Sequence, residues 1–453
     1  MPSPRSVVKK VVPTRLFKSI EPYGHFGEAV LAQTLNGFPA SGLKIIGVTG
    51  TDGKTSTVSY IAQLLASAGY KTAYITTVET DWGDGAGPQA NNTRMTTSGA
   101  MELAKSLKRI AANKVEWLVL ETSSHSLAQH RVWGLPYTIA VFTNLSPEHL
   151  DYHQTFDKYR KAKVALFKLA NKNRKGLRLG IINADDENAD YFGRAIANRL
   201  TYGVKHGELK AANIKTTPKG SNYLAKVGGD SYSISINVPG GFNVYNSLAA
   251  VAVGRAIGLD KKQIERGMAA VKGVAGRMTA IDEGQDFAVI IDYAHTPDSF
   301  EKVFKEVRPV TKGKIIVVFG SAGRRDVAKR PLQGEVAGKY ADTVIVTEED
   351  DRDMDGAAIM DEIAAGAEAA GKVKGKDLWL IHKREEAVAK AIALAKKDDT
   401  VLLLGKGHES SILGNGPRAA ELRRLPQDDS DPQRVVKRDY NEIEEAKKVL
   451  RGL

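Results

Sequence analysis

Short apolar runs and longer helical patterns alternate along most of the chain. The run "KIIGVTG" is followed by "TSTVSYIAQLLASAG", in which apolar residues recur roughly every three to four positions, and then by the run "KTAYITT". Continuous apolar runs are typical of strands that are buried on both faces. A strand, a helix and a strand in this order predict a βαβ unit with parallel strands. Similar runs at "EWLVLETSS", "YTIAVFTNLS" and "GLRLGIINADD" extend the predicted sheet.

Changes in this pattern divide the chain into three parts. Residues 1–42 are predicted to form a short helical segment. Residues 43–276 are predicted to form a central α/β domain, in which the alternating residues 206–240 indicate a small antiparallel patch. After Gly276 a second series of strand-like runs begins with "FAVIIDYAH" and ends with "TVLLLGKGHE". Residues 277–453 are therefore predicted to form a C-terminal, Rossmann-like α/β domain.

A glycine-rich turn joins the first predicted strand to the first predicted helix of the central domain. The sequence "IIGVTGTDGKTST" places Lys54 and Thr55 directly after Gly53. Backbone N–H groups at a helix N-terminus, with a lysine beside them, form an anion site, and a following threonine can bind Mg²⁺. The glycine spacing differs by one position from a strict P-loop, and a chance glycine turn is the alternative reading. The strand before and the helix after favour a P-loop ATPase domain with a mostly parallel sheet. The candidate phosphate-binding residues are Gly50, Thr51, Gly53, Lys54, Thr55 and Ser56.

Polar residues follow two further strands of the same predicted sheet. Glu121 and His149 each come just past a predicted strand end. Ligands of open α/β sheets bind at the carboxyl ends of the strands, so both residues are candidate Mg²⁺ ligands. Taken singly, a surface glutamate and a capping histidine are the simpler readings. The phosphate loop at the same predicted edge favours the functional reading.

Composition narrows the function classes. The chain has 453 residues, with 42% hydrophobic and 26% charged residues, as in ordinary globular proteins. It contains no cysteine, which excludes disulfides, thiolate metal sites and a cysteine nucleophile. No apolar run approaches the ~20 residues of a membrane span, and no signal peptide is recognised, so we expect a cytoplasmic protein. The net charge of +12 is dispersed without a basic stripe, which favours anionic small-molecule substrates over nucleic acid.

The first 20 residues differ from the rest in charge. Lys9, Lys10, Arg15 and Lys18 are interspersed with valine, leucine, phenylalanine and isoleucine. This composition suits a helix that contacts a membrane surface peripherally, although a helix packed on the central domain is the simpler reading. Pro13 interrupts any single long helix through the segment.

A series of longer motifs carries a resemblance to a known family. "GVTGTDGKTST", "ETSSHSLAQHRV", "FTNLSPEHLDYH", "YRKAKVALF", "FNVYNSLAA", "IDYAHTPDS", "GRRDVAKRPLQG" and "LLLGKGHE" occur in the order seen in Mur ligases. The chain most resembles the MurE branch, over residues 43 to 450. The resemblance implies an ATP-dependent amide ligase of peptidoglycan synthesis. ATP would phosphorylate a carboxylate, and an amine would then attack the acyl phosphate, releasing ADP and phosphate.

The resemblance also implies roles for individual residues around ATP. Lys54 would hold the phosphates and Thr55 a first Mg²⁺, while Glu121 and His149 would hold a second. Lys163 matches the lysine that family members carbamylate. By the same matching, the remaining ATP-side residues are Asn246, Arg277, Asp292 and His295.

Further matches concern the two substrates. Positions that hold the acceptor, UDP-N-acetylmuramoyl-L-alanyl-D-glutamate, match Thr96, Thr97, Ser123, Gln129 and Arg131. Arg325, Gly405 and Glu409 match residues that contact the incoming amino acid. The tetrad 349–352, "EDDR", replaces the family's "DNPR". Its arginine, Arg352, favours meso-diaminopimelate, whereas acids such as Asp350 equally suit L-lysine or ornithine; we expect diaminopimelate slightly ahead of lysine.

The N-terminal part departs from the MurE pattern. Relatives of this branch carry a whole UDP-binding domain before the phosphate loop, and residues 1–42 are too few for one. The acceptor nucleotide would then be held differently, or the acceptor would differ. Two alternatives to the MurE reaction stay open: a ligase of the cyanophycin- or folylpolyglutamate-synthetase kind, and a non-catalytic ATP-binding scaffold. We expect a monomer.

Overall fold

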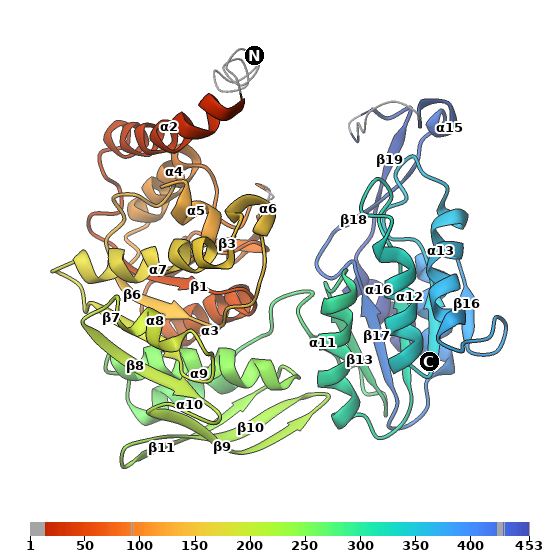
Figure 1. Ribbon diagram of the computed structural model, residues 1–453. Helices are drawn as coiled ribbons and strands as arrows, with labels where there is room; N and C mark the ends of the chain where they lie inside the picture. The colour runs from red at the N-terminus through yellow and green to blue at the C-terminus, as the bar shows by residue number, and fades with distance from the viewer. Residues whose placement is uncertain (1–13, 92, 94, 424–428, 430, 453) are drawn as a thin grey trace. The chain divides into compact units, whose positions relative to one another are not determined.

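The structure is a computed structural model that describes residues 14–91, 93, 95–423, 429 and 431–452. The chain forms two compact units, and each is described by itself (Figure 1). Unit 1 comprises residues 1–214, 222–236 and 242–272, and unit 2 comprises residues 215–221, 237–241 and 273–453. Between residues 214 and 242 the chain thus alternates between the units: residues 215–221 and 237–241 belong to unit 2, and residues 222–236 belong to unit 1.

Unit 1 is built around an eleven-stranded sheet with the order β11-β10-β9-β8-β7-β6-β1-β5-β2-β3-β4. From β2 to β9 across the middle of the sheet, neighbouring strands run parallel. The edge strands β3 and β4 are antiparallel to their neighbours. The strands are β1 Lys44–Thr49, β2 Thr72–Ile75, β3 Glu79–Asp81, β4 Gln89–Ala90, β5 Trp117–Glu121, β6 Tyr137–Phe142, β7 Leu179–Asn183, β8 Asn198–Gly203, β9 Leu209–Thr217, β10 Gly220–Val227 and β11 Asp230–Ile236.

The order of these strands positions the candidate site. β1 lies between β5 and β6 and is parallel to both, so the segments after β1, β5 and β6 meet at one edge of the sheet. All five residues of β5 and all six of β6 are buried, as the continuous apolar runs predict. The strands at 209–236 form as predicted, but they join the main sheet through β8 and do not make a separate patch.

Helices cover this sheet. Leu118, Leu120 and Phe142 share a buried cluster with apolar residues of α4 and α7. Alternate residues, such as Ile46 and Val48, face the other side, where α3 packs against β1, β2 and β5. The helices of unit 1 are α2 Thr14–Leu35, α3 Lys54–Ser67, α4 Ala100–Ala112, α5 Ser124–Ala128, α6 Leu150–His153, α7 Phe156–Lys172, α8 Ala189–Gly193, α9 Gly241–Ala256 and α10 Lys261–Ala269.

The N-terminal helix α2 begins at Thr14, directly after Pro13, and packs against α4 (Figure 1). The side chains of α2 that pack on α4, such as Ala29 and Ala32, come after the first 20 residues, so the expected packing of that segment stays a prediction. The basic residues Lys9 and Lys10 lie outside the described residues. No helix within the described ranges is long and apolar enough to cross a membrane.

Unit 2 contains a second, smaller sheet with the order β12-β13-β17-β14-β15-β16. Only β12, at the edge, is antiparallel to its neighbour. The predicted second α/β sheet is thus confirmed, and a hairpin of β18 and β19 is added to it. The strands are β12 Thr279–Ile281, β13 Ala288–Asp292, β14 Ile315–Phe319, β15 Thr343–Val346, β16 Leu378–Leu380, β17 Thr400–Leu404, β18 Ser411–Asn415 and β19 Val435–Asp439; the helices are α11 Pro297–Val307, η1 Arg308–Val310, α12 Lys329–Tyr340, α13 Gly356–Ala369, α14 Arg384–Leu394, α15 Ala419–Leu422 and α16 Glu442–Arg451.

Candidate active site

The glycine-rich turn after β1 is held in place by the segment after β6. Thr51 N–H donates to the Asn144 carbonyl oxygen at 2.9 Å, and Asp52 N–H donates to the Asn144 side chain at 2.9 Å. At Gly50 a Cβ atom would lie 1.9 Å from Thr143 Oγ1. Gly53, the residue before α3, has a φ of 77°, and a Cβ there would lie 2.4 Å from Asn246 Oδ1. Close approach and left-handed backbone therefore require glycine at both positions.

The loop fits a phosphate group. No side chain caps the N-terminus of α3, so its first N–H groups face the loop without a side-chain acceptor. Lys54 Nζ lies over the loop and donates to the Thr51 carbonyl oxygen at 2.7 Å. Asn246, predicted on the ATP side, is buried and accepts from Thr57 Oγ1 at 3.2 Å. These contacts place a positive charge and unpaired N–H groups around one small turn.

Thr55 and Glu121 meet at this edge of the sheet. Glu121 is 1% exposed, and its carboxylate accepts a hydrogen bond from Thr55 Oγ1 at 3.0 Å. It also accepts from Thr77 N–H at 2.8 Å and from Thr77 Oγ1 at 3.1 Å. A hydroxyl and a carboxylate on a phosphate loop are the oxygen ligands that Mg²⁺ prefers. The structure thus brings Thr55, expected at a first Mg²⁺, into contact with Glu121, expected at a second.

His149 contacts other residues than this pair. It precedes α6 with a φ of 55°, and its side chain is about half exposed. Its Nε2 atom is 3.7 Å from Glu148 Oε2, and its ring lies edge-on to Tyr159 at 6.3 Å. Within the described residues, no hydrogen bond or ion pair joins His149 to Thr55 or Glu121. Of the three predicted metal ligands, Thr55 and Glu121 are in direct hydrogen-bond contact.

Lys163 is almost fully buried beneath the phosphate loop. Its Nζ atom donates to the Gly50 carbonyl oxygen at 2.5 Å and lies 4.6 Å from the centre of the Tyr159 ring. Burial, and secondly the positive charge of Lys54, hold the pKa of Lys163 well below its usual range. Lys163 is therefore not a surface lysine, and its amine is neutral over a wider pH range than that of an exposed lysine.

Tyr159 connects these groups, and sequence reasoning missed it. Its Oη atom is 3.1 Å from Thr51 Oγ1 and donates to Glu148 Oε2 at 3.4 Å. Ser146 N–H donates to Thr51 Oγ1 at 3.0 Å. Hydrogen bonds therefore run from Ser146 through Thr51 and Tyr159 to Glu148. The available signal was the four-residue spacing from Tyr159 to Lys163, which places both on one face of α7.

We expect the substitution Tyr159→Phe to raise the KM for ATP about fivefold, because one hydrogen bond to the phosphate loop contributes about 1 kcal/mol. The KM for the amine substrate should stay unchanged, since the loop does not bind the amine. Steady-state kinetics with each substrate varied in turn measure both values. Tyr232→Phe is the matched control: Tyr232, on β11, is 5% exposed, and its hydroxyl accepts a hydrogen bond from Arg255 at 2.9 Å and none from the loop. Equal changes in the two variants would contradict a specific role for Tyr159.

The predicted acceptor residues gather beside Glu121. Thr97 Oγ1 donates to the Glu121 carbonyl oxygen at 2.9 Å, and Thr96 Oγ1 accepts from Thr77 at 3.0 Å. Arg131 Nη1 donates to the Thr97 carbonyl oxygen at 2.7 Å, and its guanidinium also contacts Gln129. The structure therefore brings this set together: Thr96, Thr97, Ser123, Gln129 and Arg131.

Unit 2 holds the other predicted ATP-side residues. Asp292, at the end of β13, is buried and accepts hydrogen bonds from the N–H groups of Met278 and Ala294, both at 2.8 Å. Burial raises the pKa of Asp292 despite the nearby Arg277. The Arg277 guanidinium lies 5.3 Å from the centre of the Tyr293 ring, and the His295 ring lies 4.9 Å from it. Tyr293 thus stands between Arg277 and His295.

The tetrad 349–352 is buried, and most of its side chains are paired with other residues of the protein. Asp350 Oδ1 lies 3.0 Å from Lys406 Nζ, and Arg352 donates to the Gly323 carbonyl oxygen at 2.6 Å and to Asp429 at 3.1 Å. The acids were expected to suit a substrate ammonium, yet Asp350 is already the counter-ion of a buried lysine. Burial raises the pKa of Glu349 to about 7, and its Oε2 atom has no hydrogen-bond partner.

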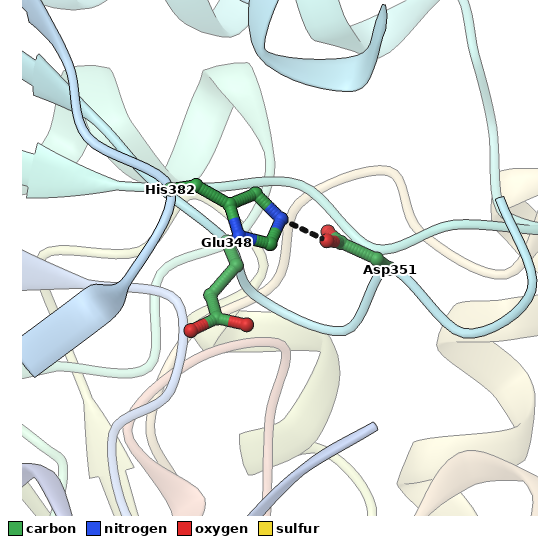
Figure 2. Close-up of side chains that lie close together, drawn as sticks. All are labelled: Glu348, Asp351 and His382. Atoms are coloured by element: carbon green, nitrogen blue, oxygen red, sulfur yellow. Dashed lines mark hydrogen bonds and ion pairs between the residues drawn. The ribbon is translucent and has the colours of Figure 1, made fainter. Parts of the chain in front are cut away.

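A cluster of Glu348, Asp351 and His382 offers three metal-ligand atoms within 4.8 Å of one another. His382 Nε2 lies 2.8 Å from Asp351 Oδ2, whereas the Glu348 carboxylate points away from this pair (Figure 2). Glu348 instead accepts from Arg438 at 2.6 Å and from the Arg384 N–H at 3.2 Å. Because the charge of Glu348 is already balanced by Arg438, we interpret the cluster as ion pairs between side chains of the protein and not as a metal site.

The remaining predicted contacts to the amino acid lie around this network. Gly405 has a φ of 101°, and a Cβ atom there would lie 2.9 Å from Glu349 Oε2. Glu409 lies 2.7 Å from Lys406 Nζ. Arg325 is exposed in the loop before α12. The structure thus groups Gly405 and Glu409 with the tetrad and leaves Arg325 as an exposed cation.

Comparisons with known proteins agree with this architecture. The Mur ligase middle domain model matches residues 48–254, and the model of the Mur ligase, glutamate ligase domain matches residues 276–407. A UDP-N-acetylmuramyl-tripeptide synthetase of Roseiflexus sp. (strain RS-1) is 43% identical over 413 residues, which cover 87% of this chain and 81% of that protein. A UDP-N-acetylmuramoyl-L-alanyl-D-glutamate–2,6-diaminopimelate ligase of Geobacillus kaustophilus (strain HTA426) is 41% identical over 392 residues, covering 85% and 78%.

A solved structure of a UDP-N-acetylmuramoyl-L-alanyl-D-glutamate–2,6-diaminopimelate ligase is similar throughout, with a TM-score of 0.67 and 27% identity. The similarity covers 96% of this chain and 83% of that one. Sequence, domain models and fold all point to one family. The chain therefore belongs to the Mur ligase family and is an ATP-dependent ligase that joins an acid to an amino acid.

Proposed function

We propose that the enzyme adds a diamino acid to UDP-N-acetylmuramoyl-L-alanyl-D-glutamate in peptidoglycan synthesis, acting as a monomer in the cytoplasm. The γ-phosphoryl group of ATP passes to the acceptor carboxylate, giving an acyl phosphate and ADP. The amine then attacks the acyl carbon, the bond to the phosphate oxygen breaks, and the amine loses a proton. Catalysis of this kind depends on positioning the ATP phosphates and the acceptor carboxylate, which are both anionic, and on compensating their negative charge.

The observation that carries the proposal is the position of Glu121. Its carboxylate bonds Thr55 of the phosphate loop at 3.0 Å, while its carbonyl oxygen bonds Thr97 of the acceptor group at 2.9 Å. Glu121 therefore connects the proposed ATP-binding loop to the proposed binding site of the acceptor carboxylate. Arg131, held at the Thr97 carbonyl oxygen, has the forked guanidinium that suits a carboxylate.

Within this proposal, Thr55, Glu121 and His149 bind two Mg²⁺ ions. When bound, magnesium would offset the negative charge of the phosphates and the acceptor. The side chain of His149 is about half exposed and therefore accessible to an ion.

We further propose that Lys163 is carbamylated. Carbon dioxide reacts with a neutral amine, and the lowered pKa of Lys163 supplies one. A carbamate keeps one N–H on Nζ, so the hydrogen bond to the Gly50 carbonyl oxygen can persist. The resulting anion lies under the loop that carries Lys54, where it can help to orient a cation.

For the amine, we propose meso-diaminopimelate in preference to L-lysine. Curated relatives at 37–41% identity are named as 2,6-diaminopimelate ligases. The distal carboxylate of diaminopimelate needs a cation, and the exposed Arg325 can supply it while Arg352 stays with Gly323 and Asp429. L-Lysine has no such carboxylate and would gain nothing from Arg325.

The deciding experiment measures ADP release with UDP-N-acetylmuramoyl-L-alanyl-D-glutamate as acceptor and with diaminopimelate, lysine and ornithine offered in parallel. We expect turnover with diaminopimelate, and a selective loss of that turnover in Arg325→Ala. Turnover with lysine alone would overturn the proposed amine but keep the ligase reaction. ATP binding without turnover on any amine would overturn the acceptor and favour a different acid substrate.

A further inference from the structure

Thr77 contacts both oxygen atoms of the Glu121 carboxylate. Its N–H donates to Glu121 Oε2 at 2.8 Å, and its hydroxyl donates to Oε1 at 3.1 Å. The sheet explains this position: β2 and β5 run parallel and Ile75 pairs with Leu120, so Thr77 comes just past the end of β2, beside the end of β5. Thr77 therefore fixes the orientation of a carboxylate that also accepts from Thr55 at 3.0 Å.

The same hydroxyl group reaches one of the predicted acceptor residues. Thr77 Oγ1 lies 3.0 Å from Thr96 Oγ1. The segment that carries Thr96 is tied to the end of β5, because Thr97 Oγ1 donates to the Glu121 carbonyl oxygen at 2.9 Å. The Thr77 hydroxyl thus lies between the Glu121 carboxylate and the Thr96 hydroxyl.

The Thr77 hydroxyl carries one hydrogen atom, so it can donate to only one of these two neighbours at a time. When it donates to Glu121, it can accept from Thr96, and the hydrogen of Thr96 is then used within the protein. When it donates to Thr96, the Thr96 hydroxyl keeps its own hydrogen for another acceptor. The two arrangements differ only by rotation of hydroxyl groups and require no movement of the backbone.

The charge at Glu121 decides between the two arrangements. A hydrogen bond to an ionised carboxylate is stronger than one between two hydroxyls, so the Thr77 hydroxyl prefers Glu121 while that charge is uncompensated. Under the proposed function, Glu121 shares its oxygen lone pairs with a magnesium ion that binds with ATP. Glu121 is then a weaker acceptor, because the cation is the largest local charge, and donation to Thr96 becomes favourable.

We propose that the Thr77 hydroxyl couples the two substrate sites, donating to Glu121 in the free enzyme and to Thr96 when magnesium and ATP are bound. Thr96 then donates its own hydrogen to the anionic acceptor. Thr77 is a positioning residue that acts through Glu121 and Thr96. The inference rests on the proposed function, which assigns Glu121 to the metal and Thr96 to UDP-N-acetylmuramoyl-L-alanyl-D-glutamate. Coupling between two sites is reciprocal, so each ligand strengthens the binding of the other by the same factor.

The test is calorimetric titration of the full chain with UDP-N-acetylmuramoyl-L-alanyl-D-glutamate, without and with Mg²⁺ and the non-hydrolysable β,γ-imido analogue of ATP. In the unsubstituted enzyme we expect the analogue to lower the Kd of the acceptor about tenfold, within the usual range for coupled sites. Thr77→Val keeps the side-chain shape and the N–H bond to Glu121 but has no hydroxyl, so the analogue should leave the Kd of the acceptor unchanged. Thr77→Ser restores the hydroxyl and should regain most of the coupling.

Thr311→Val is the matched control. Thr311 is 7% exposed, and its hydroxyl also has two partners, both in unit 2: the Val307 carbonyl oxygen at 2.9 Å and Thr400 Oγ1 at 2.8 Å. This variant should show the full coupling. The analogue alone should bind Thr77→Val as it binds the unsubstituted enzyme, which shows that the variant is folded.

Three results would contradict this role of Thr77 while leaving the ligase reaction in place. They are full coupling in Thr77→Val, no coupling in the unsubstituted enzyme, and loss of analogue binding in Thr77→Val, which would make Thr77 a support of the phosphate loop only. An acceptor that binds none of the variants, while the analogue binds all of them, would overturn the proposed function and the role of Thr77 together.

Discussion

Replacing Lys163 by alanine should lower kcat about a thousandfold, the cost of removing one positioned charge from a water-poor site. Lys163 is 2% exposed, and its Nζ atom contacts the Gly50 carbonyl oxygen of the phosphate loop. Added acetate or formate should restore part of the rate, because a small carboxylate can occupy the place of the proposed carbamate. The initial rate of ADP release, with and without the added acid, measures both effects.

Two further variants separate chemistry from folding. Lys163→Met keeps the length of the buried side chain without a nitrogen atom, so it should be as inactive as the alanine variant while its unfolding midpoint stays close to that of the unsubstituted enzyme. Lys168→Ala, on the exposed side of the same helix α7, should keep full activity. In the unsubstituted enzyme, ¹³C-labelled bicarbonate should give a carbamate signal that Lys163→Met lacks. Full activity of Lys163→Ala would exclude the residue from the site.

The largest effect on stability is expected at the buried ion pair of Arg384 and Glu442. Both side chains are 0% exposed, and two hydrogen bonds of 2.7 and 3.1 Å join them. Arg384 also donates to the carbonyl oxygens of Glu348 and Leu404, so one guanidinium ties α14 and α16 to the ends of β15 and β17. Glu442→Ala leaves this cation buried without its counter-ion, and we expect it to lower the free energy of unfolding by about 3–5 kcal/mol.

Urea unfolding followed by circular dichroism measures this loss. Glu444→Gln, two residues along the same helix and largely exposed, should change the free energy of unfolding by less than about 0.5 kcal/mol. The double variant Arg384→Met/Glu442→Leu removes both charges together and should recover most of the loss. A loss below about 1 kcal/mol in Glu442→Ala would show that water or another group already compensates Arg384.

Local patterns were sufficient to predict the two sheets and the phosphate loop. The run Lys44–Thr49 forms β1, and the glycines after it take the conformations that a loop before a helix requires, as at Gly53. Thr55 and Glu121 were expected at one edge because parallel strands end together, and they do meet. The spacing of apolar residues and the residue types that favour turns depend only on neighbouring residues in the sequence. Both can therefore be recognised without knowing the fold.

The pairing of charged and polar side chains could not be predicted from local sequence patterns. The acids of the tetrad looked available for a substrate, yet Asp350 is paired with Lys406, 56 residues further along the chain. Tyr159 joins Thr51 across 108 residues, and Arg384 meets Glu442 across 58. Which charges neutralise one another depends on the strand order and on burial, and no local pattern encodes either.

The sequence by itself thus determined the elements, their parallel arrangement, the family and the phosphate loop, because each depends on periodicity or on a contiguous motif. Only the tertiary structure decided that Lys163 is buried with a lowered pKa and that Asp350 is already paired with Lys406. These features arise where segments distant in the chain exclude water from one another, and only the packed protein fixes which surfaces lose their water.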